Sequence, residues 1–227
     1  MPTTTATTET TATTTPKRVP TQTTTMSIAT ATGSTVAARR KKACQTFMRQ
    51  AHAILDKEGS TPSALHALKL KLAVLAARTE LFPESDFPLP VAEGRLHPLL
   101  VEPDDGLALH LLIGKPGKMS NPHAHSIWCV NASVSGRERH TMWRRTDDGS
   151  VPGHATIKRV GEVIMERGHG YAMADHDIHS QEVVGDEPSV ILALYGHGFE
   201  RFPSVVWYNE EFSSVRKLPS RRGKAAA

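Results

Sequence analysis

The chain is poor in cysteine, since Cys44 and Cys129 are its only two among 227 residues. Two thiols cannot build a disulfide framework or a four-cysteine zinc site, which excludes a small secreted scaffold and favours free thiols in a reducing, cytoplasmic compartment. No apolar run approaches the roughly 18 residues that a membrane-spanning helix needs, and no apolar signal core opens the chain. We therefore expect no membrane partner.

Motifs for phosphate binding are also missing. Neither GxGxxG nor GxxxxGK[ST] occurs, so a nucleotide-binding α/β domain is not expected. The net charge of +4 comes mainly from Lys and Arg near the two ends of the chain, and no basic stripe interleaved with aromatic residues is present. These features argue against a nucleic-acid partner.

The two ends of the chain differ in composition from its middle. Residues 1–38 are rich in threonine and almost free of large apolar side chains, so we expect a disordered arm. A transit peptide is an alternative interpretation of this arm, and Met26 is an alternative start to Met1. Residues 213–227 are basic and are expected to form a flexible tail.

Residues 39–90 are predicted to form a helical hairpin. The apolar positions of 41–57 fall on one helical face, and Gly59 ends that pattern. Thr61 is suited to cap a second helix with Pro62 at its first position, and leucines at helical spacing continue to about residue 79. We expect the hairpin to pack on the domain that follows.

Residues 91–212 change to short apolar or alternating runs separated by turn residues. Eight or more short strands at such spacing indicate an antiparallel sandwich or barrel. The expected strands are 96–101, 107–113, 127–135, 138–145, 154–159, 162–166, 171–173, 179–184, 189–195 and 204–208.

Twelve histidines are the most unusual feature of the composition. In a strand, residues i and i+2 point to the same face, so His123 and His125 are expected to share one interior. His179 opens a later strand after the glycines at 168 and 170, and the pairing of HxH with a later histidine is the ligand arrangement of cupin barrels. The alternative is a pair of hydrogen-bonded histidines in a polar barrel mouth.

The residues after the HxH pair include no acid. Positions 126–130 read Ser-Ile-Trp-Cys-Val, so no carboxylate is available there as a fourth ligand. A divalent ion held by three neutral imidazoles keeps its charge and open positions, which favours an anionic bidentate ligand such as a thiolate with an adjacent amine.

At this point the sequence resembles the thiol dioxygenases, the cupins that include cysteine dioxygenase and 3-mercaptopropionate dioxygenase. The resemblance implies one mononuclear Fe(II) on His123, His125 and His179, and the addition of O2 to the sulfur of a small thiol to give a sulfinate. It covers about residues 94–208, and its motifs are Leu99-Leu100, Pro103–Gly106, Pro122–His125, Trp128, Gly136–Arg139, Asp177–Ser180 and Leu192–Gly196.

The resemblance also implies roles for three other residues. Arg95 falls in the window of the arginine that binds the substrate carboxylate, with a surface arginine as the alternative. Cys129 and Tyr195 fall at the positions of the catalytic cysteine and tyrosine that some members cross-link; the alternatives are a small buried strand residue and a core aromatic. The family's histidine and serine before this tyrosine are replaced by Ala193 and Ile191.

The prediction is therefore a mainly β protein, a cupin (double-stranded β-helix) barrel with an N-terminal α-helical hairpin, acting as an Fe(II)-dependent thiol dioxygenase. We expect a monomer or weak homo-oligomer. One alternative is a cupin enzyme that uses zinc, nickel or manganese in oxygen-independent or further oxidative chemistry. The other is a non-catalytic cupin that binds a small molecule. Glu138 is expected to be a cross-strand partner, and His110 and His140 pocket or surface residues.

Overall fold

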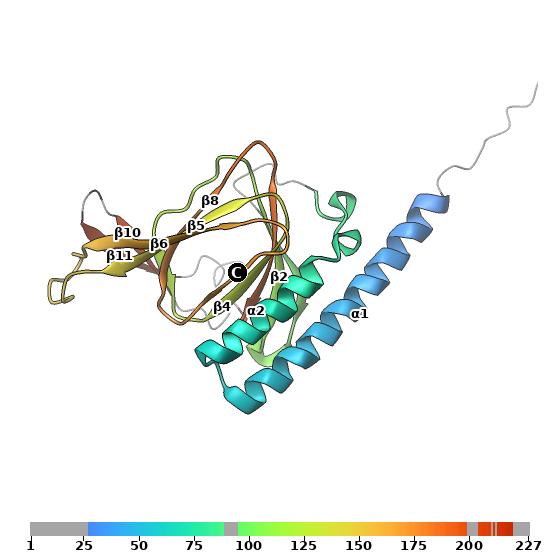
Figure 1. Cartoon of the computed structure of the whole chain (residues 1–227), viewed down its shortest axis with the longest axis horizontal. Helices are drawn as coiled ribbons and strands as arrows, with labels where there is room; N and C mark the ends of the chain where they lie inside the picture. The colour runs from blue at the N-terminus through green and yellow to red at the C-terminus, as the bar shows by residue number, and fades with distance from the viewer. Residues whose placement is uncertain (1–26, 89–94, 199–203, 210, 212, 220–227) are drawn as a thin grey trace, which may run out of the picture.

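A computed structural model describes residues 27–88, 95–198, 204–209, 211 and 213–219 (Figure 1). Two α-helices come first, α1 (Ser27–Glu58) and α2 (Pro62–Ala76). Two short 3-10 helices, η1 (Thr79–Leu81) and η2 (Glu84–Asp86), lie between α2 and the first strand, and a third, η3 (Pro103–Asp105), lies between the first two strands. The strands are β1 (Arg95–Val101), β2 (Ala108–Gly114), β3 (His123–His125), β4 (Cys129–Ser135), β5 (Glu138–Arg145), β6 (Ile157–Met165), β7 (Gly170–Met173), β8 (Ile178–Val183), β9 (Ser189–Tyr195), β10 (Ser204–Asn209) and β11 (Ser214–Pro219).

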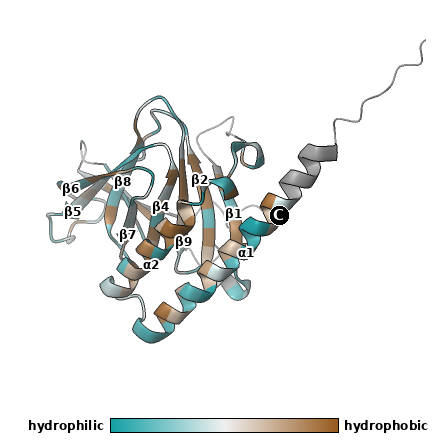
Figure 2. Cartoon of the chain, turned by 45° about the vertical axis from the view of Figure 1, so that its right-hand side comes forward, coloured by the Kyte–Doolittle hydropathy of each residue, from teal (hydrophilic) through white to brown (hydrophobic). Residues whose placement is uncertain are grey.

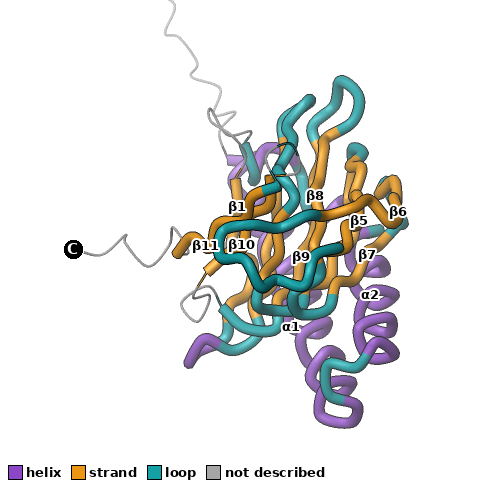
Figure 3. Tube along the Cα trace, turned by 90° about the vertical axis from the view of Figure 1, so that its left-hand side faces the viewer, coloured by secondary structure: helices purple, strands orange, loops and turns teal. Residues whose placement is uncertain are grey.

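The strands form two antiparallel sheets that face each other (Figure 3). One sheet has the order β1-β2-β9-β4-β7 and the other the order β11-β10-β3-β8-β5-β6. Side chains of the two sheets meet between them, as when the hydroxyl of Ser189 on β9 donates to Glu138 on β5. This arrangement is the double-stranded β-helix, or cupin, barrel, and it confirms the predicted fold class.

The helical hairpin covers the outer face of the five-stranded sheet (Figures 1 and 2). Alternation along β9 divides the two faces: Leu192 and Leu194 pack with the helices, whereas Ala193 and Tyr195 pack in the barrel interior. Each buried leucine of this interface contributes about 1.5–3 kcal/mol relative to exposure. The helices therefore hold the outer face of the sheet, and its inner face is left for the site.

Local sequence signals explain both helices. The Thr61 hydroxyl accepts a hydrogen bond from the Ala64 amide at 3.3 Å, and Pro62 occupies the first position of α2. Helix α1 begins at Ser27, so the prediction that residues 1–38 are disordered is wrong for 27–38. Alanines favour helix in this stretch, and adding turns to a helix already formed at 39–58 needs no new nucleation. Residues 1–26 lie outside the described part. No helix within the described ranges is long and apolar enough to cross a membrane.

The C-terminal segment and one strand also differ from expectation. Residues 214–219, predicted as part of a flexible tail, form β11, which pairs along its length with β10. Pairing with a neighbouring strand satisfies their backbone groups, a stabilisation that composition does not reveal. The runs 154–159 and 162–166 merge into the single strand β6, and His123–His125 form the separate short strand β3.

Candidate metal centre

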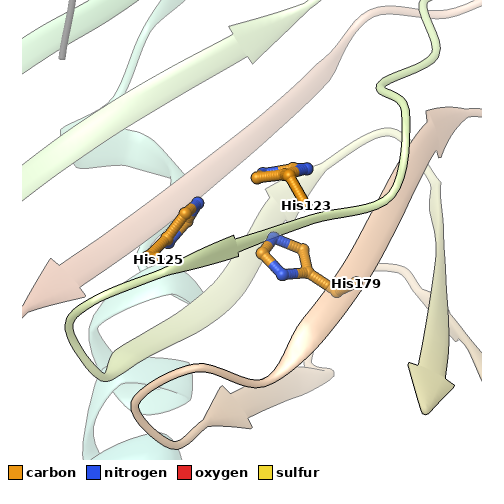
Figure 4. A group of neighbouring side chains, drawn as sticks. All are labelled: His123, His125 and His179. Carbon is orange, nitrogen blue, oxygen red and sulfur yellow. The ribbon is translucent and has the colours of Figure 1, made fainter. Parts of the chain in front are cut away.

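Three histidines from two neighbouring strands converge in the barrel interior (Figure 4). His123 and His125 lie on β3, and β3 pairs with β8 so that His123 stands directly opposite His179. Antiparallel pairing thus brings together residues that are more than fifty positions apart in the chain. The structure brings all three predicted ligands into one cluster.

The spacing of these rings suits a single metal ion. Each residue offers one nitrogen, and the three nitrogens lie within 4.8 Å of one another. The ring centroids are 4.2 Å apart for His123 and His179, 4.9 Å for His125 and His179, and 5.0 Å for His123 and His125. Nitrogens that bind one ion at about 2.0–2.1 Å lie roughly 3–3.5 Å from one another, so small side-chain rotations suffice to close the cluster.

Burial keeps these imidazoles neutral. Desolvation lowers the pKa of His123 to about 4 and that of His125 to about 3, with smaller contributions from neighbouring histidines. The pKa of His179 is lowered well below its ordinary value for the same reason. A neutral imidazole has the lone pair that a metal ligand needs, so the ring nitrogens are ready to bind at neutral pH.

Contacts around His123 set its tautomer and orientation. Its Nδ1 lies 2.9 Å from the backbone carbonyl of Asn121, which can only accept, so Nδ1 donates and the lone pair falls on Nε2. The ring also stacks on Trp207 of β10, with centroids 4.7 Å apart. His123 is therefore held in one position with Nε2 as its ligand atom.

The donor set fits a divalent transition metal. The metal-ligand cluster found among the described residues consists of three histidines and contains no carboxylate. The buried Nδ1 of His179 makes no hydrogen bond of good geometry within the described chain. The backbone carbonyl of Asp177 raises the pKa of this ring, but by less than burial and the neighbouring histidines lower it. Three imidazoles suit zinc, copper, iron or nickel, and they leave coordination positions open.

Cys129 and Tyr195 lie beside this cluster. They stand directly opposite each other on β4 and β9, and a hydrogen bond joins their side chains. The Cys129 thiol also donates to Oδ1 of Asn131 at 3.4 Å, while burial raises its pKa strongly. The Tyr195 ring lies 6.3 Å from that of His125, measured between centroids. The pair thus forms one wall next to the histidines.

Arg95 is the first residue of β1, where it pairs with Ile113 of β2. Strand β1 lies at one edge of its sheet. The Arg95 side chain lies outside the described part of the chain, so its carboxylate-binding role stays a prediction.

His110 is an interior residue whose place the sequence left open. It is buried on β2 directly opposite Ala193, and its ring lies 6.0 Å from the Tyr195 ring in an edge-to-face arrangement. His110 on β2 therefore lies beside Ala193, two positions before Tyr195 on β9. In the sequence, the only signal for this interior position was a histidine between two leucines, Leu109 and Leu111.

Comparison with known proteins finds similarity among solved structures alone. No protein-family model and no curated protein sequence matches the chain. Among solved structures, oxalate oxidase in complex with glycolate is 13% identical, covers 52% of this chain and 56% of its own, and has a TM-score of 0.38. The chain thus spans about half the length of the oxalate oxidase structure that it matches.

Two further structures have similar scores. The cupin domain of a transcriptional regulator from Enterobacter cloacae is 16% identical, covers 47% of this chain and 98% of its own, and has a TM-score of 0.34. Hydroquinone 1,2-dioxygenase in complex with Cd2+ and 4-hydroxybenzonitrile is 15% identical, covers 45% of this chain and 64% of its own, and has a TM-score of 0.35. We draw no conclusion about activity from likenesses of this degree.

Proposed function

We propose that the protein is an Fe(II)-dependent thiol dioxygenase that adds O2 to the sulfur of a small thiol and yields a sulfinate. The observation that carries the proposal is the ligand set: three neutral imidazoles, two buried and that of His125 half-buried, whose nitrogens lie within 4.8 Å of one another, without a carboxylate in the cluster. The resemblance of the sequence to thiol dioxygenases, which use such a set, supports it.

His123, His125 and His179 would hold the ion, and none of them would bring a negative charge to it. When bound, Fe(II) would supply a Lewis acid for the thiolate and the redox chemistry for its reaction with O2. Because no ligand neutralises the ion, an anionic sulfur is favoured as the remaining partner.

The wall beside the histidines supports a specific division of roles. The Tyr195 hydroxyl would hydrogen-bond the substrate, and Cys129 on the neighbouring strand would hold that hydroxyl in place. The apolar residues packed around this pair, Ala108, Ile127 and Met173, exclude water from it. Arg95 is proposed to bind the carboxylate of a carboxyl-bearing substrate.

The proposal is tested by loading the full chain with Fe(II) and following O2 uptake with cysteine, 3-mercaptopropionate and cysteamine. We expect O2 consumption together with a sulfinate product detected by mass spectrometry. The matched control is His179→Ala, which should lose both iron and uptake. Turnover without oxygen, or full metal occupancy with no uptake across the thiols, would contradict the proposal.

A further inference from the structure

Three buried polar side chains connect across the barrel interior next to the metal centre. The Ser189 hydroxyl on β9 donates to Oε1 of Glu138 at 2.5 Å, and Oε2 of Glu138 lies 3.0 Å from Nε2 of His140 on β5. The exposed fractions are 0% for Ser189, 7% for Glu138 and 1% for His140. Glu138, expected to be a cross-strand partner, therefore links the two sheets and orients a histidine of its own strand.

Close packing holds this connection in place. A side chain at Gly114 would bring its Cβ to 2.7 Å from the Ser189 hydroxyl and 2.6 Å from a methyl of Val183, so only glycine fits there. Since the carboxylate can shift little, its hydrogen bond selects the orientation of the His140 ring.

The Glu138 carboxylate also selects the tautomer of His140. A carboxylate only accepts, so Nε2 of His140 carries the proton and Nδ1 keeps a lone pair. This Nδ1 is buried and has no hydrogen-bond partner within the described residues. A buried acceptor without a donor is unfavourable, so Nδ1 is suited to receive a donor from a bound molecule.

His140 faces the same space as the metal ligands. It lies two residues from Met142 on one face of β5, and Met142 stands directly opposite His179. Because β5 pairs with β8, His140 and His179 lie on adjacent strands and face the same interior.

We propose that Nδ1 of His140 accepts a hydrogen bond from the amino group of the substrate, which makes the preferred substrate a thiol that carries an amine, with or without a carboxylate for Arg95, rather than a thiol that carries a carboxylate alone. This inference rests on the proposed function for the thiol and adds the recognition of the amine. The buried residues that the structure describes include no Lys or Arg, so Glu138 would also favour a cationic substrate group over an anionic one.

The test uses two thiols that differ only in the group beyond the same two-carbon spacer, cysteamine and 3-mercaptopropionate. Each is titrated without oxygen into the Co(II)-loaded full chain, and the thiolate-to-cobalt absorption band reports its Kd. We expect His140→Leu to weaken cysteamine about ten-fold or more and 3-mercaptopropionate by less than about two-fold. His140→Asn, whose amide oxygen can take the place of Nδ1, should retain most of the cysteamine affinity.

Two outcomes separate the inference from the function on which it rests. Equal weakening of both thiols by His140→Leu, or no weakening of either, would overturn the role of His140 alone. Absence of thiol binding by the wild-type protein would instead contradict the proposed function. Independently of any metal, nitrogen NMR of the metal-free chain should show His140 protonated on Nε2 only, and a proton on Nδ1 would overturn the inference.

Discussion

Replacing His179 by alanine is the most direct perturbation of the metal centre. His179 is 1% exposed and supplies one of three clustered nitrogens, so His179→Ala removes a third of the protein ligands without touching the helices or the outer faces of the sheets. We expect the variant to fold and to lose most of its response to metal.

The size of the effect follows from linkage. A metal present at one hundred times its Kd stabilises the folded chain by about 2.7 kcal/mol, which raises the Tm of a domain of this size by about 5–10 °C. A four-ligand zinc site is worth about 10–16 kcal/mol, or roughly 3 kcal/mol for each ligand, so loss of one ligand weakens binding about a hundred-fold. At the same metal concentration the variant should gain only about 0.4 kcal/mol, a shift of roughly 1 °C.

Thermal unfolding with and without Zn(II) measures this difference, and elemental analysis of the purified proteins reports retained metal. The matched control is His176→Asn, because His176 is exposed and lies three residues from His179 at a positive φ of 68° that asparagine tolerates. The control should keep the full wild-type shift. A wild-type shift that persists in His179→Ala would refute the three-histidine centre.

Three further predictions concern the rest of the fold. Leu68→Ala, in the fully buried face of α2, should lower the free energy of unfolding by about 2–5 kcal/mol, whereas Leu70→Ala at an exposed position should change it by less than about 1 kcal/mol. Urea unfolding compares the two variants, and equal losses would argue against the packing of the hairpin. Thr61→Ala should cost about 1 kcal/mol through loss of the cap to α2, measured by the same titration, and no change would show that the cap is not needed. Burial raises the pKa of Cys44 to about 11 and raises that of Cys129 further, so iodoacetamide at pH 7.5 should label neither thiol in the native protein. The labelling rate of Cys44 should rise about ten-fold per pH unit toward pH 11. Mass spectrometry follows the labelling, and rapid labelling at pH 7.5 would contradict the burial.

Local patterns in the sequence were sufficient for the fold class. The Thr61–Pro62 start of α2 and the alternating runs of the barrel depend on neighbours one to four residues apart, and such short-range periodicity survives in the chain itself. The HxH pair is likewise local, because two residues at i and i+2 of a strand must share a face. His179 was added from its position after a glycine-rich turn and from family resemblance.

Other features depended on partners that the sequence could not identify. Strand β11 forms because β10 offers it a pairing edge, and helix α1 extends to Ser27 because the helix that follows is already formed.

Inside the barrel, alternation shows that His110, Glu138 and His140 can point inward, but it does not show which atoms they meet. Ser189 reaches Glu138 from the opposite sheet, and His110 reaches Tyr195 from the neighbouring strand. Strand order and register create these contacts between residues about 50 to 85 positions apart, and order and register are set by the packing of the whole barrel rather than by any short segment.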